Sequence, residues 1–454
     1  MSSETPSWGI EPVPPQLRQL GLVDSLALWG NLGISLLVIV AGTYLVPGLA
    51  LKDALLAILV GGLVGNAMLA VAGLIGAEAR VPAMVLLRAP LGRRGSYLAT
   101  AVNVLQNLGW ATFELIVIGT AAAALSKQVL GFEAKWLWVI AFGLLTFGFA
   151  LLGPIGFVRT WVRRFALWVV LASLAYLTWW TLDGAHLHAL WAKPGDGSLT
   201  FWAGVDLVIA MPASWLPLVA DYTRFSRDRR SALVGSGVGY LLPNLWLFAL
   251  GALLLLSRDL GDPTDLLTTI AGGGLAGGLA LLALTVDETD EPFANVYSAA
   301  VSIQNVLPRA PQAVLLAAVT AVATGGALLV DLGRYLDFLY LLGSAFVPLF
   351  GVQLAHWLVT GARYTRQDVF GAPVVRPELL LAWVGGFCLY QWLEPVGPGW
   401  WTSLVARTHP HGLPWGGASL PAFGASFALA ALLAWVGRLG YAGAAARRDR
   451  ESVV

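Results

Sequence analysis

Aromatic, acidic and amide side chains recur at helical spacing within residues 96–125, inside a strongly apolar stretch. Asn103, Asn107, Trp110 and Glu114 are separated by four, three and four positions, so on an α-helix they share one face. Trp110 and Glu114 lie one turn apart, and this spacing sends an indole and a carboxyl group into the same space. Such a pair suits a flat heterocycle, which stacks on the ring and donates its N–H groups to the carboxylate. The amides are better explained as ties between helices.

A second group of polar residues is an acidic run followed by a proline: Asp287, Glu288, Thr289, Asp290, Glu291 and Pro292. The apolar runs on either side, near 275–286 and 293–307, are each too short to cross a bilayer alone. We therefore expect the acids at membrane depth, lining a wet cavity, with Pro292 interrupting the helix at the carbonyl of Glu288. Oxygen-rich surroundings of this kind suit a small hard cation or a proton relay.

Two further segments combine helix breakers with polar groups. The stretch 25–46 carries Gly30, Asn31 and Gly33, and the stretch 201–222 carries Pro212, Ser214, Trp215 and Pro217. Glycine and proline both weaken a helix. Interrupted membrane helices at matching positions of two halves of a chain indicate a midplane binding site of a transporter.

These side chains must be positioned by membrane-spanning helices. Of the 454 residues, 57% are hydrophobic and 12% are charged, about half the charged fraction of a soluble domain. Runs of about 20 apolar residues predict twelve spans, near 25–46, 52–76, 96–125, 136–153, 165–182, 201–222, 232–256, 275–305, 312–330, 336–359, 378–395 and 419–439.

Positive charge orients these spans. With a cytoplasmic N-terminus and twelve crossings, 20 of the 27 Lys and Arg residues fall on the cytoplasmic side. This bias predicts that both termini are cytoplasmic. The polar, proline-containing N-terminus does not read as a cleaved signal peptide, and we expect a multi-pass protein of the cell inner (cytoplasmic) membrane.

The composition excludes several other classes. The net charge of +1 gives no basic patch for nucleic acid, and the single cysteine, Cys388, excludes an internal disulfide framework. An enzyme is not expected, because no nucleophile–base set, His-rich metal pattern or phosphate loop is present. A passive channel fits poorly with breaks around a composite polar site. The expected partners are a small heterocyclic substrate and membrane lipid, with no resident cofactor and no obligate protein partner.

Several motifs resemble the nucleobase:cation symporter-1 family, the purine–cytosine permeases. They are PVP at 12–14, LWGNLGISL in the first span, QNLGWATFELIV in the third, SWLPLVADYTRF in the sixth and FANVYSAAVS in the eighth. Within this family, the motifs are most similar to those of the branch for cytosine and hydroxymethylpyrimidine. The resemblance implies an all-α, leucine-transporter-type fold of five plus five helices in inverted repeat, with helices 1 and 6 broken and two helices added at the C-terminus.

The implied organisation is a cytoplasmic segment 1–24, a first repeat 25–182, a second repeat with its preceding outer loop 183–359, helices 11 and 12 at 360–439 and a cytoplasmic tail 440–454. The implied activity is alternating-access import of a nucleobase or related heterocycle, coupled to Na⁺ or H⁺. The implied substrate-binding residues are Trp110, Glu114, Ser214, Trp215 and Asn295. The implied coupling-ion site comprises Thr289, Asp290 and main-chain carbonyls near Ile34 and Leu37.

Two residues depart from the family pattern. Asp290 replaces a neutral hydroxyl residue, which leaves Na⁺ and H⁺ coupling both open, and Val38 stands where a polar substrate contact is expected. The roles of Asp287, Glu288 and Glu291 also stay open. The alternative function is cation-coupled symport of another small solute, such as an amino acid or a hydantoin- or allantoin-like compound.

Overall fold

The computed structural model describes residues 9–157, 167–183, 185–258, 260, 265–408 and 417–451, and its elements are helical. The part before residue 200 contains a short 3₁₀ helix, η1 (Pro15–Leu17), and α1 (Leu22–Leu32), α2 (Leu36–Thr43), α3 (Leu51–Ala79), α4 (Ala83–Leu86), α5 (Arg88–Leu91), α6 (Ser96–Leu130), α7 (Lys135–Phe157), α8 (Leu167–Leu182) and α9 (Leu187–Ala192). The only β-bridge in the described part joins Leu20 to Ser226.

The rest of the chain forms helices of the same kinds. They are α10 (Phe201–Ser214), α11 (Val219–Thr223), α12 (Arg229–Ser257), α13 (Leu266–Ala271), α14 (Gly274–Asp287), α15 (Asp290–Val306), α16 (Gln312–Ala327), the 3₁₀ helix η4 (Leu332–Arg334), α17 (Tyr335–Val359), α18 (Arg366–Phe370), α19 (Pro377–Leu393), α20 (Gly399–Ala406) and α21 (Ser419–Glu451).

Each predicted span corresponds to one helix or to a pair of consecutive helices. Within the described residues, seven stretches are long and apolar enough to cross a membrane, and the bent pair α1–α2 makes an eighth. The remaining predicted spans coincide with α8, α14–α15, α16 and α19, which are shorter or more polar. The predicted all-α membrane architecture is therefore observed.

The two predicted helix breaks are also observed. The chain bends by 54° between α1 and α2, and residues 33–35 between them are not helical. Four residues, 215–218, separate α10 from α11. The residues of both breaks are buried within the protein, as irregular backbone in a membrane protein must be.

A third break differs from the sequence expectation. The predicted span 275–305 is divided at Glu288 and Thr289, where α14 ends and α15 begins. Pro292 is the third residue of α15, in the first turn, where a helix has no internal partner for a backbone N–H. The expected interruption at Glu288 is present, but its carbonyl is not free, because it accepts a hydrogen bond from the Glu291 amide at 3.2 Å.

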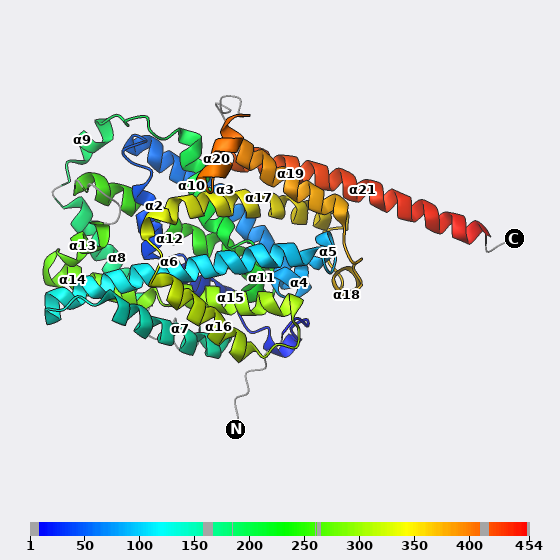
Figure 1. The fold of residues 1–454 in the computed structure, drawn as a ribbon, viewed down its shortest axis with the longest axis horizontal. Helices are drawn as coiled ribbons and strands as arrows, with labels where there is room; N and C mark the ends of the chain where they lie inside the picture. The colour runs from blue at the N-terminus through cyan, green and yellow to red at the C-terminus, as the bar shows by residue number, and fades with distance from the viewer. Residues whose placement is uncertain are drawn as a thin grey trace, which may run out of the picture.

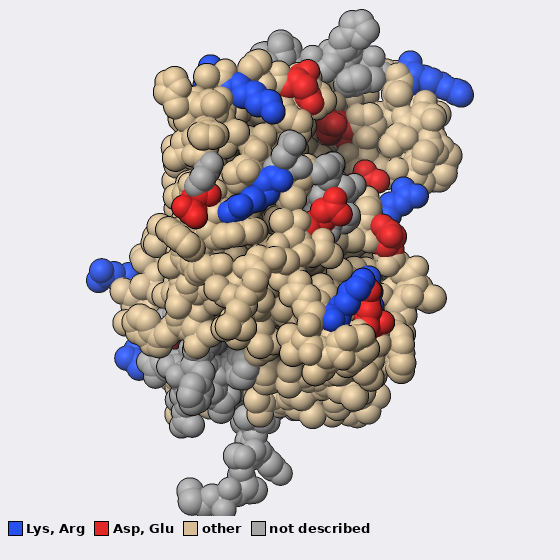
Figure 2. Space-filling view, turned by 90° about the vertical axis from the view of Figure 1, so that its left-hand side faces the viewer, with Lys and Arg blue, Asp and Glu red and all other residues tan. Residues whose placement is uncertain are grey.

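The long helices α6, α7, α17 and α19 run roughly along one direction, which is horizontal in Figure 1. The short helices α9 and α13 lie at one end of this bundle, and α4, α5 and α18 lie at the other. Figure 2 looks at the end with α9 and α13, the predicted outer face, where acidic and basic side chains are interspersed among uncharged ones. The helix α21 extends beyond the body of the bundle (Figure 1).

Some of the positively charged residues that orient the predicted spans lie outside the described residues. Arg159, Arg163 and Arg164, between the predicted spans 136–153 and 165–182, are among the undescribed positions, as are residues 1–8 and 452–454 of the two termini. The predicted tail from residue 440 is helical over its described part, because α21 continues to Glu451.

The broken first span is pressed tightly against α12. A Cβ atom at Gly42 would overlap the carbonyl group of Phe248, and one at Gly251 would overlap the carbonyl group of Ile39. Glycine at both positions lets the two backbones approach closely, as small residues do at helix contacts in membranes. This packing fixes α2, and with it one wall of the site described next.

Candidate functional site

A small cavity, here called the Trp110 cavity, lies where the broken helices meet α6, α12 and α15. It is lined by Ser35, Val38, Trp110, Glu114, Met211, Ser214, Trp215, Leu218, Tyr240, Glu291 and Asn295. The space open to the centre of a water-sized sphere is about 10 Å³, which is room for about one water molecule. All five residues that the sequence suggested for substrate binding line this one cavity.

The polar wall of the cavity centres on Glu114. The Asn295 side-chain amide donates to Glu114 Oε1 at 2.9 Å and to the Glu291 carbonyl at 3.1 Å. The second oxygen, Glu114 Oε2, and the indole nitrogen Nε1 of Trp110 are buried and have no hydrogen-bond partner among the described residues. Buried polar atoms are rarely left without a partner, so the unpaired acceptor and donor indicate a polar ligand.

Aromatic rings form the other walls. Trp110 packs edge-on against Tyr335 and Phe338, with ring centroids 5.8 and 5.5 Å apart. Trp215 packs edge-on against Trp29 at 5.5 Å, and its indole N–H donates to the Tyr240 hydroxyl at 2.9 Å. Contacts of this kind hold both tryptophans in fixed orientations.

The polar groups of Ser214 are already engaged in hydrogen bonds within the protein. Its hydroxyl donates to the Met211 carbonyl at 2.7 Å, and its own carbonyl accepts from Gln106 at 2.8 Å. Asn103 in turn donates to Ser302 on α15 at 2.8 Å. Asn103 and Gln106 thus tie helices together, which is the role that the sequence favoured for the amides.

Several lining residues escaped the sequence analysis. Tyr240 is the only tyrosine of α12, and it could have been noticed in the sequence because a buried tyrosine usually seeks a hydrogen-bond partner. Val38 does line the cavity, as the apolar departure from the family pattern suggested, and Ser35 one turn earlier supplies a polar side chain instead. Glu291 also lines it, whereas Asp287 and Asp290 do not.

The remaining acids face the break between α1 and α2. The Asn31 amide donates to Asp290 Oδ2 at 2.6 Å and to Asp287 Oδ1 at 3.4 Å. Glu288 accepts from the Ser35 hydroxyl at 2.7 Å and from the Leu36 amide at 2.6 Å. The acidic run and the first break, about 250 residues apart in the chain, therefore meet inside the helix bundle.

The four predicted coupling-ion residues lie at this junction, but some of their oxygens are already engaged. Thr289 Oγ1 donates to the Val286 carbonyl at 2.6 Å, and the Leu37 carbonyl accepts from the Tyr335 hydroxyl at 3.2 Å. Ile34 is buried beside Asn31, to whose carbonyl its amide donates. Three other buried oxygens have no partner in the described structure: Asn31 Oδ1, Asp287 Oδ2 and Asp290 Oδ1.

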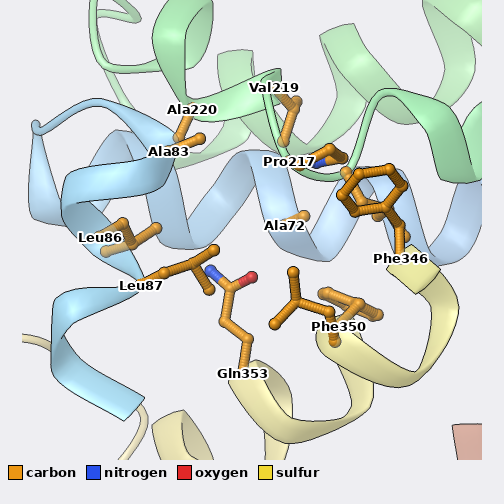
Figure 3. A pocket seen from close by; sticks show the side chains of 12 residues that line it. Ala72, Ala83, Leu86, Leu87, Pro217, Val219, Ala220, Phe346, Phe350 and Gln353 are labelled. Atoms are coloured by element: carbon orange, nitrogen blue, oxygen red, sulfur yellow. The ribbon is translucent and has the colours of Figure 1, made fainter. Parts of the chain in front are cut away.

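A second cavity of similar size offers different chemistry. Figure 3 shows it between α3, α4, the Leu216–Pro217 segment and α17. The amide of Gln353 reaches into a space whose other walls are apolar (Figure 3). Because these walls carry no aromatic–acid pair, the Trp110 cavity is the stronger candidate for a heterocycle.

The fold matches solved transporters over nearly its whole length. The chain aligns with the nucleobase-cation-symport-1 family transporter Mhp1, in a closed conformation with bromovinylhydantoin bound, with a TM-score of 0.74 and 20% identity over 98% of this chain and 97% of that one. The architecture is thus that of a multi-pass transporter with a broken first helix, as the leucine-transporter-type prediction required.

The sequence comparisons identify the family. A family model described as a permease for cytosine/purines, uracil, thiamine and allantoin matches residues 12–371. The cytosine permease of Escherichia coli (strain K12) is 25% identical over 393 residues, 85% of this chain and 89% of the relative. The hydantoin permease of Microbacterium maritypicum is 22% identical over 375 residues, 78% and 76% of the two chains. The chain belongs to this permease family, so it is a transporter rather than an enzyme.

Proposed function

We propose that this protein is a secondary-active importer that couples uptake of a nucleobase or related planar heterocycle to a cation gradient by alternating access. The observation that carries the proposal is the Trp110 cavity, where a buried indole, an unpaired carboxyl oxygen and an amide converge between two broken helices. Ring stacking and N–H donation to Glu114 and Asn295 together suit a flat, nitrogen-rich ring. Cytosine and hydroxymethylpyrimidine are the proposed substrates.

The main rival within this fold is import of an amino acid. In such a transporter the N-terminus of a half-helix binds the carboxylate of the substrate. Here the N-terminus of α2 is already capped by the Glu288 carboxyl group, through Ser35 and the Leu36 amide. This contact favours a substrate without a carboxylate. Hydantoin- or allantoin-like compounds are the second candidate class, because permeases for both are among the similar sequences.

We further propose that the coupling cation binds where α1–α2 meets α14–α15. Thr289, Asp290 and carbonyls near Ile34 and Leu37 are the proposed ligands, and the unpaired oxygens of Asn31 and Asp287 extend this set. Carboxyl, amide and carbonyl oxygens suit a hard cation, and carboxyl groups also carry protons. The proposed location is the cell inner membrane with both termini cytoplasmic.

Radiolabelled uptake into proteoliposomes tests the substrate. Accumulation of cytosine or hydroxymethylpyrimidine is expected for the unaltered chain and is expected to be lost in Trp110→Ala and Glu114→Ala. The matched control is Trp136→Ala, because Trp136 is 61% exposed on α7. Full uptake in both cavity variants would contradict the site, and an amino acid accumulated in place of the bases would contradict the substrate class.

The coupling ion is tested separately from the substrate. Uptake is measured with Na⁺ replaced by K⁺ at constant pH, and again with the proton gradient dissipated at constant Na⁺. Loss of uptake only on Na⁺ removal identifies sodium, and loss only on dissipation identifies the proton. Uptake that survives both treatments would contradict cation coupling.

A further inference from the structure

Two carboxyl groups face the Trp110 cavity, not one. Glu114 on α6 and Glu291 on α15 both line it. Asn295 donates to one oxygen of Glu114 and to the backbone carbonyl of Glu291, and Glu114 Oε2 has no partner in the described structure. Both residues are nearly completely buried, at 1% and 5% exposure. A buried carboxyl group without a partner is costly, so acceptors are in excess here.

Among the described residues, no positively charged side chain pairs with these acids. The lining residues include no lysine, arginine or histidine. The ion pairs formed between described residues involve neither Glu114 nor Glu291. Charge balance at the cavity must therefore come from a proton or from a bound cation.

The N-terminus of α2, an element that could attract an anion, is also occupied. The N-terminus of α2 has a partial positive charge, and its first amide, that of Leu36, donates to Glu288 rather than to the cavity. The other lining residues include the rings of Trp110, Trp215 and Tyr240, beside apolar side chains and the uncharged polar residues Ser35, Ser214 and Asn295. Aromatic faces attract cations electrostatically. The carboxyl groups, the rings and the capped helix end all favour a positively charged ligand.

We propose that the Trp110 cavity binds its heterocycle as a planar cation with adjacent N–H donors, of the amidinium or guanidinium type, rather than as a neutral imide or an anion. One ring N–H and one exocyclic amino group donate to Glu114 and Glu291, and the ring lies between aromatic walls. This inference rests on the function proposed above and specifies the charge and hydrogen-bonding edge of its substrate.

The test is a binding measurement on the full-length purified protein with two five-membered rings of similar size. The first is 2-aminoimidazole, which is cationic at neutral pH, and the second is imidazolidin-2-one, which is neutral. Because hydrogen bonds to charged groups are the stronger ones, 2-aminoimidazole is expected to bind about tenfold more tightly or better. Calorimetric titration gives both dissociation constants without requiring transport.

Matched variants show which residues cause the preference for the cationic ring. Glu114→Gln and Glu291→Gln keep the side-chain shape and remove the charge, so each is expected to weaken 2-aminoimidazole by about tenfold and imidazolidin-2-one by less than about twofold. Glu133→Gln is the control, because Glu133 is exposed beside Lys127 at one end of the bundle. A normal size-exclusion profile shows that each variant is folded. The preference of the unaltered protein tests the proposal even where a variant does not fold.

Each result decides the matter. Equal or tighter binding of imidazolidin-2-one by the unaltered protein would overturn the cation proposal, as would an unchanged preference in both folded variants. Cytosine is included as a third ligand. If cytosine binds and Trp110→Ala abolishes that binding while the cationic ring is not preferred, only the present inference fails. If none of the three rings binds, the proposed function fails with it.

Discussion

The contact between Glu288 and the start of α2 leads to a quantitative prediction. Glu288 accepts from the Ser35 hydroxyl at 2.7 Å and from the Leu36 amide at 2.6 Å, and it is 1% exposed. Glu288→Ala removes both acceptors and leaves the Leu36 amide at the buried start of α2 without a partner, while Ser35 still caps the Leu37 amide at 3.1 Å. Hydrogen bonds to charged groups contribute about 1.5–3 kcal/mol each, so the gross loss is about 3–6 kcal/mol.

Part of this loss is offset. Asp287, Asp290 and Glu291 are neighbours of Glu288 in the same buried run, and removal of one acid relieves repulsion among like charges. A net destabilisation of about 2–4 kcal/mol is the expected result, which lowers the melting temperature of a chain of this length by about 2–4 °C. Glu288→Gln keeps one acceptor oxygen and is expected to lose about half as much.

Thermal unfolding of the purified protein, with and without added formate, is the assay. Formate supplies a small carboxylate that fits the uncapped end of α2, and a ligand that binds only the folded state raises its stability. We expect formate to raise the melting temperature of Glu288→Ala and to leave that of the unaltered protein unchanged. Chloride at the same ionic strength controls for salt.

The reasoning is refuted if Glu288→Ala melts within about 1 °C of the unaltered protein, or if formate and chloride act equally on it. Glu133→Ala shows how far the melting temperature shifts when an exposed acid is removed. Its pairing with Lys127 at 2.7 Å is more than half exposed on both sides, and such surface pairs contribute about 0–1 kcal/mol.

Three other predictions follow from the packing and from the charge distribution. Asp206→Ala is expected to destabilise the fold by about 2–4 kcal/mol in thermal unfolding, because the buried carboxyl group accepts from the Ala418 and Ser419 amides and caps α21. Gly42→Ala is expected to reduce both stability, by about 1–3 kcal/mol or more, and uptake, because its Cβ would overlap the Phe248 carbonyl. In a Cys388→Ser background, a membrane-impermeant maleimide added to intact cells is expected to label a cysteine at Glu133 but not one at Asp368.

Each of these has its own control. Gly424→Ala on α21 introduces a Cβ with no neighbour within 4 Å, so it should leave stability unchanged. If Gly42→Ala has no larger effect than Gly424→Ala, the packing argument is contradicted. An unchanged melting temperature for Asp206→Ala would contradict the stabilising role of this cap. Labelling of the Asp368 position in intact cells, with the Glu133 position protected until the membrane is permeabilised, would reverse the proposed orientation.

Local features of the sequence predicted much of the fold. Hydropathy depends only on neighbouring residues, and every predicted span coincides with a helix or a helix pair. Glycine and proline act on their own turn of the backbone, so the breaks in the first and sixth spans were also readable. The helical spacing of Trp110 and Glu114 placed both on one face, and the structure brings both to one cavity.

The acidic run shows where local reasoning ended. Four acids in five residues look alike in sequence, yet Glu291 turns to the cavity, Glu288 caps α2, and Asp287 and Asp290 meet Asn31. The break at Glu288 and Thr289, rather than a kink caused by Pro292, separates these directions. Which way each acid points depends on the neighbours that α1, α2 and α6 bring to it.

The sequence by itself therefore determined the membrane class, the family, the helix breaks and the residue types available for binding. Only the tertiary structure decided that Tyr240 joins the site, that Glu288 occupies the start of α2, and that Glu114 shares its cavity with a second acid. The physical reason is that spans and breaks arise from interactions within one or two helical turns. Partners of buried polar groups are chosen by contacts between segments far apart in the chain, such as that from Asn31 to Asp290, which are 259 residues apart.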